Sequence, residues 1–379
     1  MESIEITGPN RVDSNGIRRL SYTHVTKDGY HALSMVVNGD REAVRKQVAK
    51  HHGVPLARVS FGPYYRDEPQ PDFDYQYRQA TYERGASNLV TKRFATGAAG
   101  TPNDVRVSWG GSVWFSGSAN CFARFDEARN LSIVKRTVGH MPTVMWFERS
   151  LPDYGWRYLD PQGRRIGFIS DSGVFGDEIV LEAGAHPVMF GPNGSDFNSP
   201  IVATDAGFVL DLQKNRRFAT WTPTIDLIGI ADDTAWQIAN SKLVCFFPGH
   251  ERGERWAALK GGNSKPGFIQ GPAASHGNLI YMDPGRDVIG FVEGYDKIVE
   301  IQLPQGTGIR WMHVVTEDNI WFTGKRGQSL FKLNRKRIVK EYPCATPNSD
   351  LFRLDMGSDS LWFTEPSHNC LTYADISNL

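Results

Sequence analysis

Two histidine–aspartate pairs are the first residues in this sequence whose types suggest chemistry. His140 is followed by Asp160 and His186 by Asp205, and both pairs occupy matching positions in a pattern that recurs along the chain. An imidazole beside a carboxylate can hold a divalent metal ion, or it can act as a base that the carboxylate orients. The spacing matches no known metal-binding signature. In the structural alternative, each histidine lies near a proline and satisfies loop carbonyls.

The recurring pattern that positions these residues is clearest near the C-terminus. Residues 319–325 (NIWFTGK) and 360–366 (SLWFTEP) place Trp321 and Trp362 41 residues apart. An apolar run and a polar turn precede each Trp-Phe strand, and a third strand follows it. A period of 41 residues built from four short strands predicts blades of a β-propeller.

Weaker copies of the same pattern continue toward the N-terminus. Their second strands are centred at intervals of 35 to 45 residues, which predicts a seven-bladed ring; six or eight blades are the alternatives. The interval of 35 residues is short, so the alignment of the copies between residues 207 and 262 could be shifted by one or two residues. The five centres are Trp114, Trp156, Ile201, Trp236 and Ile280.

The last copy ends at Leu379 after three strands, which would leave an open sheet edge. Residues 88–95 (NLVTKRFA) are similar to residues 337–342, the fourth strand of the preceding copy. We therefore predict that residues 88–95 form the outer strand of the last blade and close the ring. The propeller would then span residues 88–379.

The N-terminal residues do not follow the period. A hairpin of residues 17–26 and 30–37, a helix over residues 41–51 and a strand over residues 56–61 predict a small ββαβ module within residues 1–65. We expect this module to lean on the propeller. Residues 66–87 form a Pro/Tyr-rich linker whose aromatic side chains either pack onto the blades or bind a partner.

A polar ring at one mouth of the propeller channel follows from this register. The start of each first strand and the end of each second strand lie at the same face, because adjacent strands are antiparallel. The side chains at these positions carry both signs of charge and predict a ligand-binding ring. Besides the two histidine–aspartate pairs, its members are Asp226, Asn240, Lys265, Asp283, Arg310, Lys325, Asp350 and Glu365.

Composition excludes several classes of protein. The chain has 42 Lys and Arg against 42 Asp and Glu, so it lacks the basic surplus that nucleic acids or anionic membranes require. No apolar run approaches the roughly 20 residues of a membrane span, and the start does not resemble a secretory signal. The four cysteines lie far apart, which indicates free thiols. We expect a cytoplasmic protein.

The Trp-Phe-Thr-Glu strand, the polar turn before it and the 41-residue step resemble the streptogramin (virginiamycin B) lyase family of seven-bladed propellers. That resemblance implies elimination chemistry that linearises a cyclic depsipeptide, with Mg²⁺ as cofactor and with His and Glu side chains at the channel mouth. Glu365 matches the family's glutamate. The family's histidine positions fall on Arg310 and Leu351, so the catalytic histidines are not matched.

Three functions follow. The leading hypothesis is a propeller that binds a small molecule or peptide at the channel mouth, with residues 1–87 covering that mouth or recruiting a protein partner. The second is a metal-assisted lyase or hydrolase acting on a cyclic or modified peptide, in which His140, His186 and Glu365 are catalytic. The third is an interaction scaffold without chemistry.

Overall fold

The computed structural model describes most of the chain, and the statements below concern these residues. They are residues 2–6, 10–12, 18–27, 29–62, 70–71, 74–108, 111–136, 142, 145–148, 155–193, 196–212, 215–219, 227–231, 234–239, 242–246, 255–259, 268–270, 279–293, 297–334, 336–377 and 379. No helix among them is long and apolar enough to cross a membrane.

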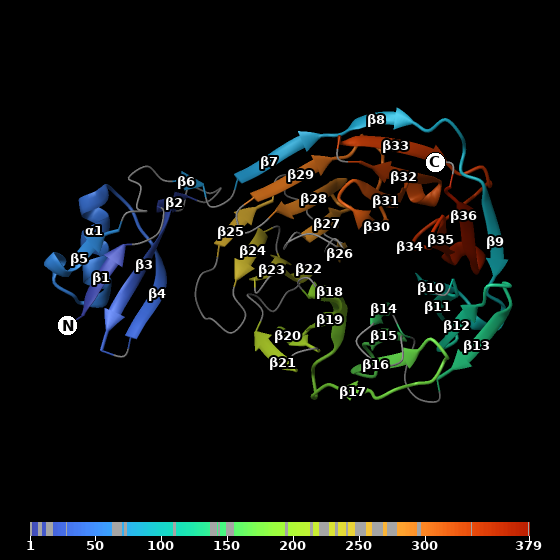
Figure 1. The fold of residues 1–379 in the computed structure, drawn as a ribbon, viewed down its shortest axis with the longest axis horizontal. Helices are drawn as coiled ribbons and strands as arrows, with labels where there is room; N and C mark the ends of the chain where they lie inside the picture. Colours follow the sequence, from blue (N-terminus) through green and yellow to red (C-terminus); the bar gives the residue numbers. More distant parts are fainter. Residues whose placement is uncertain are drawn as a thin grey trace.

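Successive antiparallel sheets follow one another around a common centre, in the order of the chain (Figure 1). Neighbouring strands in sequence are neighbours in each sheet, as in the blades of a β-propeller. The predicted fold class is therefore confirmed. One eight-stranded sheet joins two such runs through a single parallel bridge between Asn193 and Ile230. Divided there, strands β9–β36 form seven runs of four, which we number as blades 1–7; the predicted seven blades are in keeping with this division.

Blades 1–4 contain strands β10 to β25. Their bounds are β10 (Pro102–Val107), β11 (Val113–Gly117), β12 (Cys121–Phe125) and β13 (Leu131–Lys135); β14 (Met145–Glu148), β15 (Gly155–Asp160), β16 (Arg165–Ser170) and β17 (Ile179–Val180); β18 (Pro187–Asn193), β19 (Asp196–Thr204), β20 (Phe208–Asp211) and β21 (Arg216–Ala219); and β22 (Leu227–Ala231), β23 (Thr234–Ala239), β24 (Lys242–Phe246) and β25 (Arg255–Ala258).

Blades 5–7 contain strands β26 to β36, and the fourth strand of blade 7 is β9 (Thr91–Ala95). Their bounds are β26 (Phe268–Gln270), β27 (Leu279–Asp283), β28 (Val288–Glu293) and β29 (Lys297–Gln302); β30 (Trp311–Thr316), β31 (Asn319–Gly324), β32 (Ser329–Leu333) and β33 (Ile338–Pro343); and β34 (Leu354–Met356), β35 (Ser360–Glu365) and β36 (Cys370–Asp375), with short 3₁₀ turns at Gly97–Ala99, Lys325–Gly327 and Pro366–His368.

The repeat register agrees with the structure. All of the predicted second-strand centres fall in the second strand of a blade, from Trp114 in β11 to Trp362 in β35. The side chains of Trp114, Trp156, Trp321 and Trp362 are fully buried, as expected for aromatic residues packed between neighbouring sheets. The side chain of Trp236 lies outside the described part of the structure.

The ring closes through an N-terminal strand, as predicted. Strand β9 (Thr91–Ala95) pairs antiparallel with β36, with Ala95 opposite Cys370 and Thr91 opposite Ala374. Blade 7 is therefore built from both ends of the propeller segment (Figure 1). This pairing covers the edge of β36 that would otherwise be open.

The prediction of a linker over residues 66–87 needs correction. Strand β7 (Asp74–Gln79) adds to blade 5 parallel to β29, and β8 (Thr81–Arg84) adds to blade 6 parallel to β33. Together with β9, these strands run along the outer edges of three successive blades. The expected packing of aromatic side chains is present, because Tyr75 and Tyr82 donate hydrogen bonds to Glu300 and Glu341.

The N-terminal unit contains the predicted hairpin and helix together with strands that the sequence did not reveal. Asp40 caps α1, accepting a hydrogen bond from the Ala43 N–H at 2.9 Å, and Gly53 ends the helix in the left-handed conformation with φ 65°. Strand β1 pairs with both β3 and β5. The elements are β1 (Ser3–Ile6), β2 (Asn10–Val12), β3 (Arg18–Thr26), β4 (Gly29–Val36), α1 (Arg41–His52), a 3₁₀ turn (Leu56–Arg58), β5 (Val59–Phe61) and β6 (Gln70–Pro71).

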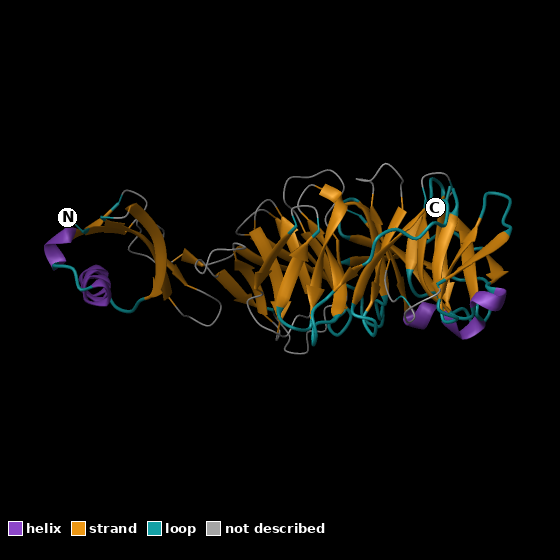
Figure 2. Cartoon of the chain, turned by 90° about the horizontal axis from the view of Figure 1, so that it is seen from below, coloured by secondary structure: helices purple, strands orange, loops and turns teal. Residues whose placement is uncertain are grey.

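This unit has its own core, in which Ile6, Leu20 and Val48 of the sheet and helix are buried together. Figures 1 and 2 show it to one side of the ring, beyond the outer strands of the blades. That position contradicts the expectation that the N-terminal unit covers the channel mouth.

Candidate functional site

Three of the predicted ring residues line one cavity. Arg310, Lys325 and Asp350 surround a space of about 540 Å³, together with Gly306, Gly308 and Arg326. Arg310 precedes the first strand of blade 6 and Lys325 follows its second strand, while Asp350 precedes the first strand of blade 7. The antiparallel pairing of β30 with β31, in which Trp311 faces Thr323, brings the first two positions together.

Arg310 and Asp350 join blades 6 and 7 at this cavity. The Arg310 Nη1 lies 2.6 Å from Asp350 Oδ1 and also donates to the Leu351 carbonyl at 3.1 Å. The guanidinium lies 4.8 Å from the ring centre of Phe352. Burial by itself would raise the pKa of Asp350, but the hydrogen bonds from Arg310 and Ser367 hold this pKa below its usual value. Asp350 is therefore a carboxylate at neutral pH.

Lys325 is held by the carboxylate of Glu341. Its Nζ lies 2.6 Å from both oxygens of Glu341, which also accepts hydrogen bonds from Ser329 Oγ at 2.8 Å and from the Tyr82 hydroxyl at 2.6 Å. Burial opposes ionisation of Glu341, but these donors outweigh it and lower the pKa of this carboxyl. The outer strand β8, through Tyr82, thus helps to position the Lys325 side chain at the cavity.

Arg326 is a lining residue that sequence reasoning missed. It occupies a turn in which Lys325, Arg326 and Gly327 all have positive φ, at 48°, 60° and 84°. A non-glycine residue in this region is strained by about 1–3 kcal/mol. Only glycine fits at position 327, because a Cβ there would overlap the backbone of Asp350 and Leu351. The signal that could have revealed this turn is the basic pair before Gly327, directly after a strand.

His186 and Asp205 are brought together as the sequence predicted. The imidazole Nδ1 lies 2.8 Å from Asp205 Oδ2, and the other carboxylate oxygen accepts the His186 backbone N–H at 2.7 Å. Burial would raise the pKa of Asp205, but these hydrogen bonds keep it below its usual value. The two side chains are 42% and 45% exposed, so the imidazole is accessible from solvent. His140 lies outside the described residues, as do Asp226, Asn240 and Lys265.

Two predicted ligand-binding carboxylates are instead fully buried. Asp160 accepts hydrogen bonds from the Gly163 N–H at 2.7 Å and from Arg136 at 3.2 Å. Asp283 accepts one from Arg286 Nε at 2.7 Å, and the Gly285 N–H lies 3.1 Å away. Both hold the turn that follows a second strand, so the ligand-binding role predicted for them gains no support.

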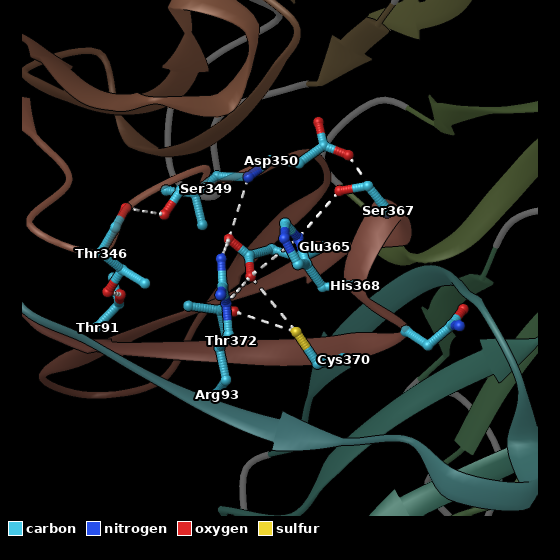
Figure 3. Close-up of polar contacts among 12 residues, drawn as sticks. Thr91, Arg93, Thr346, Ser349, Asp350, Glu365, Ser367, His368, Cys370 and Thr372 are labelled. Atoms are coloured by element: carbon cyan, nitrogen blue, oxygen red, sulfur yellow. Dashed lines mark hydrogen bonds and ion pairs between the residues drawn. The ribbon is translucent and has the colours of Figure 1, made fainter.

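Glu365 is also buried, at the junction where the ring closes. Its Oε2 lies 2.5 Å from Arg93 Nε of strand β9, and its Oε1 accepts the Asp350 backbone N–H at 3.1 Å. The Cys370 thiol lies 3.4 Å away (Figure 3). Burial would raise the pKa of Glu365, but these partners, Arg93 foremost, lower it. The geometry favours a structural role in closure, and the predicted catalytic role gains no support.

Cys370 should react slowly in the folded protein. Burial, followed by the adjacent Glu365 carboxylate, raises the pKa of this thiol to about 11, so only about one thiol in a thousand would be ionised at pH 8. We expect iodoacetamide to modify Cys370 at least tenfold more slowly in native than in denatured protein, as followed by peptide mass spectrometry. Equal rates in the two states would contradict this environment.

No group of three or more His, Cys, Asp or Glu side chains within the described ranges is placed to hold a metal ion. The His186–Asp205 pair supplies two of the ligands that such an ion would need. The Mg²⁺ implied by the family resemblance therefore stays a prediction.

Comparisons with known proteins identify the fold. No protein-family model matches the chain, and no curated protein sequence matches it. Among solved structures, virginiamycin B lyase from Staphylococcus aureus is 14% identical, with a TM-score of 0.62 over 75% of this chain and 98% of the lyase. A streptogramin B lyase structure is 15% identical, with a TM-score of 0.62 over 76% of this chain and 98% of its own.

A structure of YCF48 bound to D1 peptide is also similar, at 11% identity and a TM-score of 0.54, covering 77% of this chain and 98% of that one. At such identities the likeness concerns the fold alone. In its fold, the chain is a streptogramin lyase-like β-propeller.

Proposed function

We propose that this propeller binds a peptide or another small molecule at the mouth of its channel, in the cavity lined by Arg310, Lys325 and Asp350. One observation carries the proposal: residues selected only by their positions in the repeat, in two different blades, line the same cavity. Its volume of about 540 Å³ falls within the range of about 300–1,000 Å³ typical of ligand pockets.

Two further observations support a peptide ligand. The cavity combines glycine backbone at Gly306 and Gly308 with charged groups, which suits a ligand with both amide and charged functions. The structure of YCF48, a propeller-fold neighbour, holds a D1 peptide, and a virginiamycin B lyase structure from Staphylococcus aureus holds quinupristin.

The test is affinity selection from a mixture of degenerate, N-acetylated octapeptides, read by mass spectrometry. The double variant Arg310→Ala/Asp350→Ala removes both members of one ion pair, so neither charge of that pair is left without its partner. We expect wild-type protein to retain a subset of peptides and the double variant to bind them at least tenfold more weakly, because charge-assisted hydrogen bonds are worth about 1.5–3 kcal/mol.

The matched control is Lys336→Ala, an exposed change in the turn between β32 and β33, away from the cavity. It should bind the retained peptides as wild type does. Equal binding by the double variant, or no retained peptide at all, would contradict peptide binding at this cavity.

A second candidate function is a lyase or hydrolase acting on a cyclic or modified peptide, and the His186–Asp205 pair favours it. With the proton on Nδ1 held by Asp205, the Nε2 lone pair of His186 is available as a base. Quinupristin is the test substrate, incubated with and without Mg²⁺ and analysed by liquid chromatography. Product formation that falls about 100-fold or more in His186→Gln would support catalysis; no product under either condition would count against it.

The third proposal is that a protein partner binds the N-terminal unit within residues 2–62, a narrower region than the predicted residues 1–87. Residues 74–84 are already paired with the outer strands of blades 5 and 6. The N-terminal unit, with its own core and its place beside the ring, is the part left for a partner.

A further inference from the structure

The cavity at blades 6 and 7 contains more positive than negative charge. Its lining includes three cations, Arg310, Lys325 and Arg326, and one carboxylate, Asp350. Glu341 neutralises Lys325, and Asp350 neutralises Arg310. Counting both carboxylates, one positive charge remains, and it belongs to Arg326.

Arg326 makes no hydrogen bond or ion pair with another described residue, and its side chain is exposed at the cavity. The backbone of its turn is nevertheless well fixed. Lys325 N–H donates to the Thr307 carbonyl at 2.6 Å and Leu351 N–H donates to the Gly327 carbonyl at 3.1 Å. The fold therefore holds a strained, left-handed arginine at the cavity without giving it a partner of its own, which is a pattern associated with ligand sites.

Arg310 supplies a second set of open donors. Only its Nη1 is engaged, by Asp350 and the Leu351 carbonyl, while its Nε and Nη2 have no hydrogen-bond partner among the described residues. The stacking on Phe352 and the ion pair hold the guanidinium plane in place. Two guanidinium groups with open N–H donors on one cavity match the planar geometry of a carboxylate.

We propose that the ligand is an acidic peptide and that the cavity recognises a carboxylate through Arg326 and the free nitrogens of Arg310. This inference rests on the proposed binding function and names the chemistry of its ligand. The carboxylate could come from an Asp or Glu side chain or from a peptide C-terminus, because both offer the same two oxygens to a guanidinium.

The experiment uses the full chain and three N-acetylated octapeptide mixtures of otherwise equal composition. The first contains Asp and Glu and has an amidated C-terminus; the second lacks Asp and Glu but has a free C-terminal carboxylate; the third has neither. We expect wild-type protein to retain the first or the second at least tenfold better than the third, with affinity falling as NaCl is raised. The better-retained mixture identifies the source of the carboxylate.

Charge reversal supplies the residue-level test. Arg326→Glu should abolish the preference, so that the mixtures with a carboxylate are retained about as well as the third mixture. Lys336→Glu, the same charge change on an exposed turn of the same blade, should leave the preference unaltered. Thermal melts monitored by circular dichroism should be the same for both variants and wild type, since neither side chain makes a hydrogen bond, ion pair or ring contact with another described residue.

Three outcomes would overturn the inference, and they differ in whether they also overturn the proposed function. Equal retention of all three mixtures by wild-type protein, or an undiminished preference in Arg326→Glu, would overturn acidic recognition and leave peptide binding in place. Retention of none of the mixtures would overturn both acidic recognition and the peptide form of the proposed function.

Discussion

Deleting residues 1–95 is expected to abolish cooperative folding of the propeller, whereas deleting residues 1–73 should leave the melting transition of the ring intact. The longer deletion removes β9, so β36 becomes an open edge and Glu365 becomes a buried carboxylate without Arg93. It also removes Phe94, whose ring centre lies 5.3 Å from that of the buried Trp362. Differential scanning calorimetry would separate the transitions of the two truncated proteins.

A point variant isolates the electrostatic part of this closure. Arg93→Ala should destabilise the ring by about 2–3 kcal/mol, somewhat below the cost of breaking a fully buried pair because Arg93 is 30% exposed. Deletion of residues 1–90, which removes β7 and β8 but keeps β9, serves as the intermediate control. A ring that melts identically with and without residues 74–95 would show that closure by β9 does not stabilise it.

Gly290→Ala should be the most damaging single substitution of a glycine in blade 5, costing about 3 kcal/mol. Gly290 lies opposite Tyr281 in the β27–β28 pair, and a Cβ there would overlap the Tyr281 ring. The ring cannot move freely, because its hydroxyl donates to the buried Glu300 at 2.7 Å, and Arg286 holds that carboxylate at 2.6 and 2.9 Å. Displacing Tyr281 would leave a buried acceptor with one donor fewer.

Gly306→Ala is the matched control. Gly306, unlike Gly290, has a positive φ, of 80°, and no atom lies within 4 Å of the position of its Cβ, so only backbone strain of about 1 kcal/mol is expected. Urea denaturation followed by tryptophan fluorescence would measure both changes. Equal costs for the two substitutions would mean that the Tyr281–Glu300 contact contributes little.

The same contact explains a repeat that is easily overlooked in the sequence. Tyr158 of blade 2 faces Gly167 and donates to Glu178 at 2.7 Å, in the same arrangement as the tyrosine, glycine and glutamate of blade 5. The segments around them, YLDPQGRRIGF and YMDPGRDVIGF, share Tyr, Asp, Pro, Ile, Gly and Phe at the same positions and differ in the middle, where the chain turns between the two strands. Asp160 and Asp283 belong to these segments, which is why both are buried turn-holding residues rather than ligands.

The repeat in the sequence did not predict several pairings between distant segments. Strand β1 is only four residues long, and β7 and β8 pair with strands more than 200 residues away. Such short segments carry no periodicity of their own, and only the exposed edge of a partner strand selects them. Tyr75 and Tyr82 could be placed near the blades as aromatic residues, but not on Glu300 and Glu341.

The amino-acid sequence by itself determined the β-propeller fold, the second strand of every copy and closure of the ring by a strand within residues 88–95, because each depends on a local alternation of apolar and polar residues repeated at a nearly constant interval. It also placed Arg310, Lys325 and Asp350 at equivalent ends of strands. Only the tertiary structure decided which of these polar residues face a cavity and which are buried against an arginine, as Glu365 is against Arg93. Burial and ion pairing depend on which segment packs against the end of each strand. In this ring that segment belongs to a neighbouring blade, as Arg310 does for Asp350, or to an outer strand distant in sequence, as Arg93 of β9 does for Glu365.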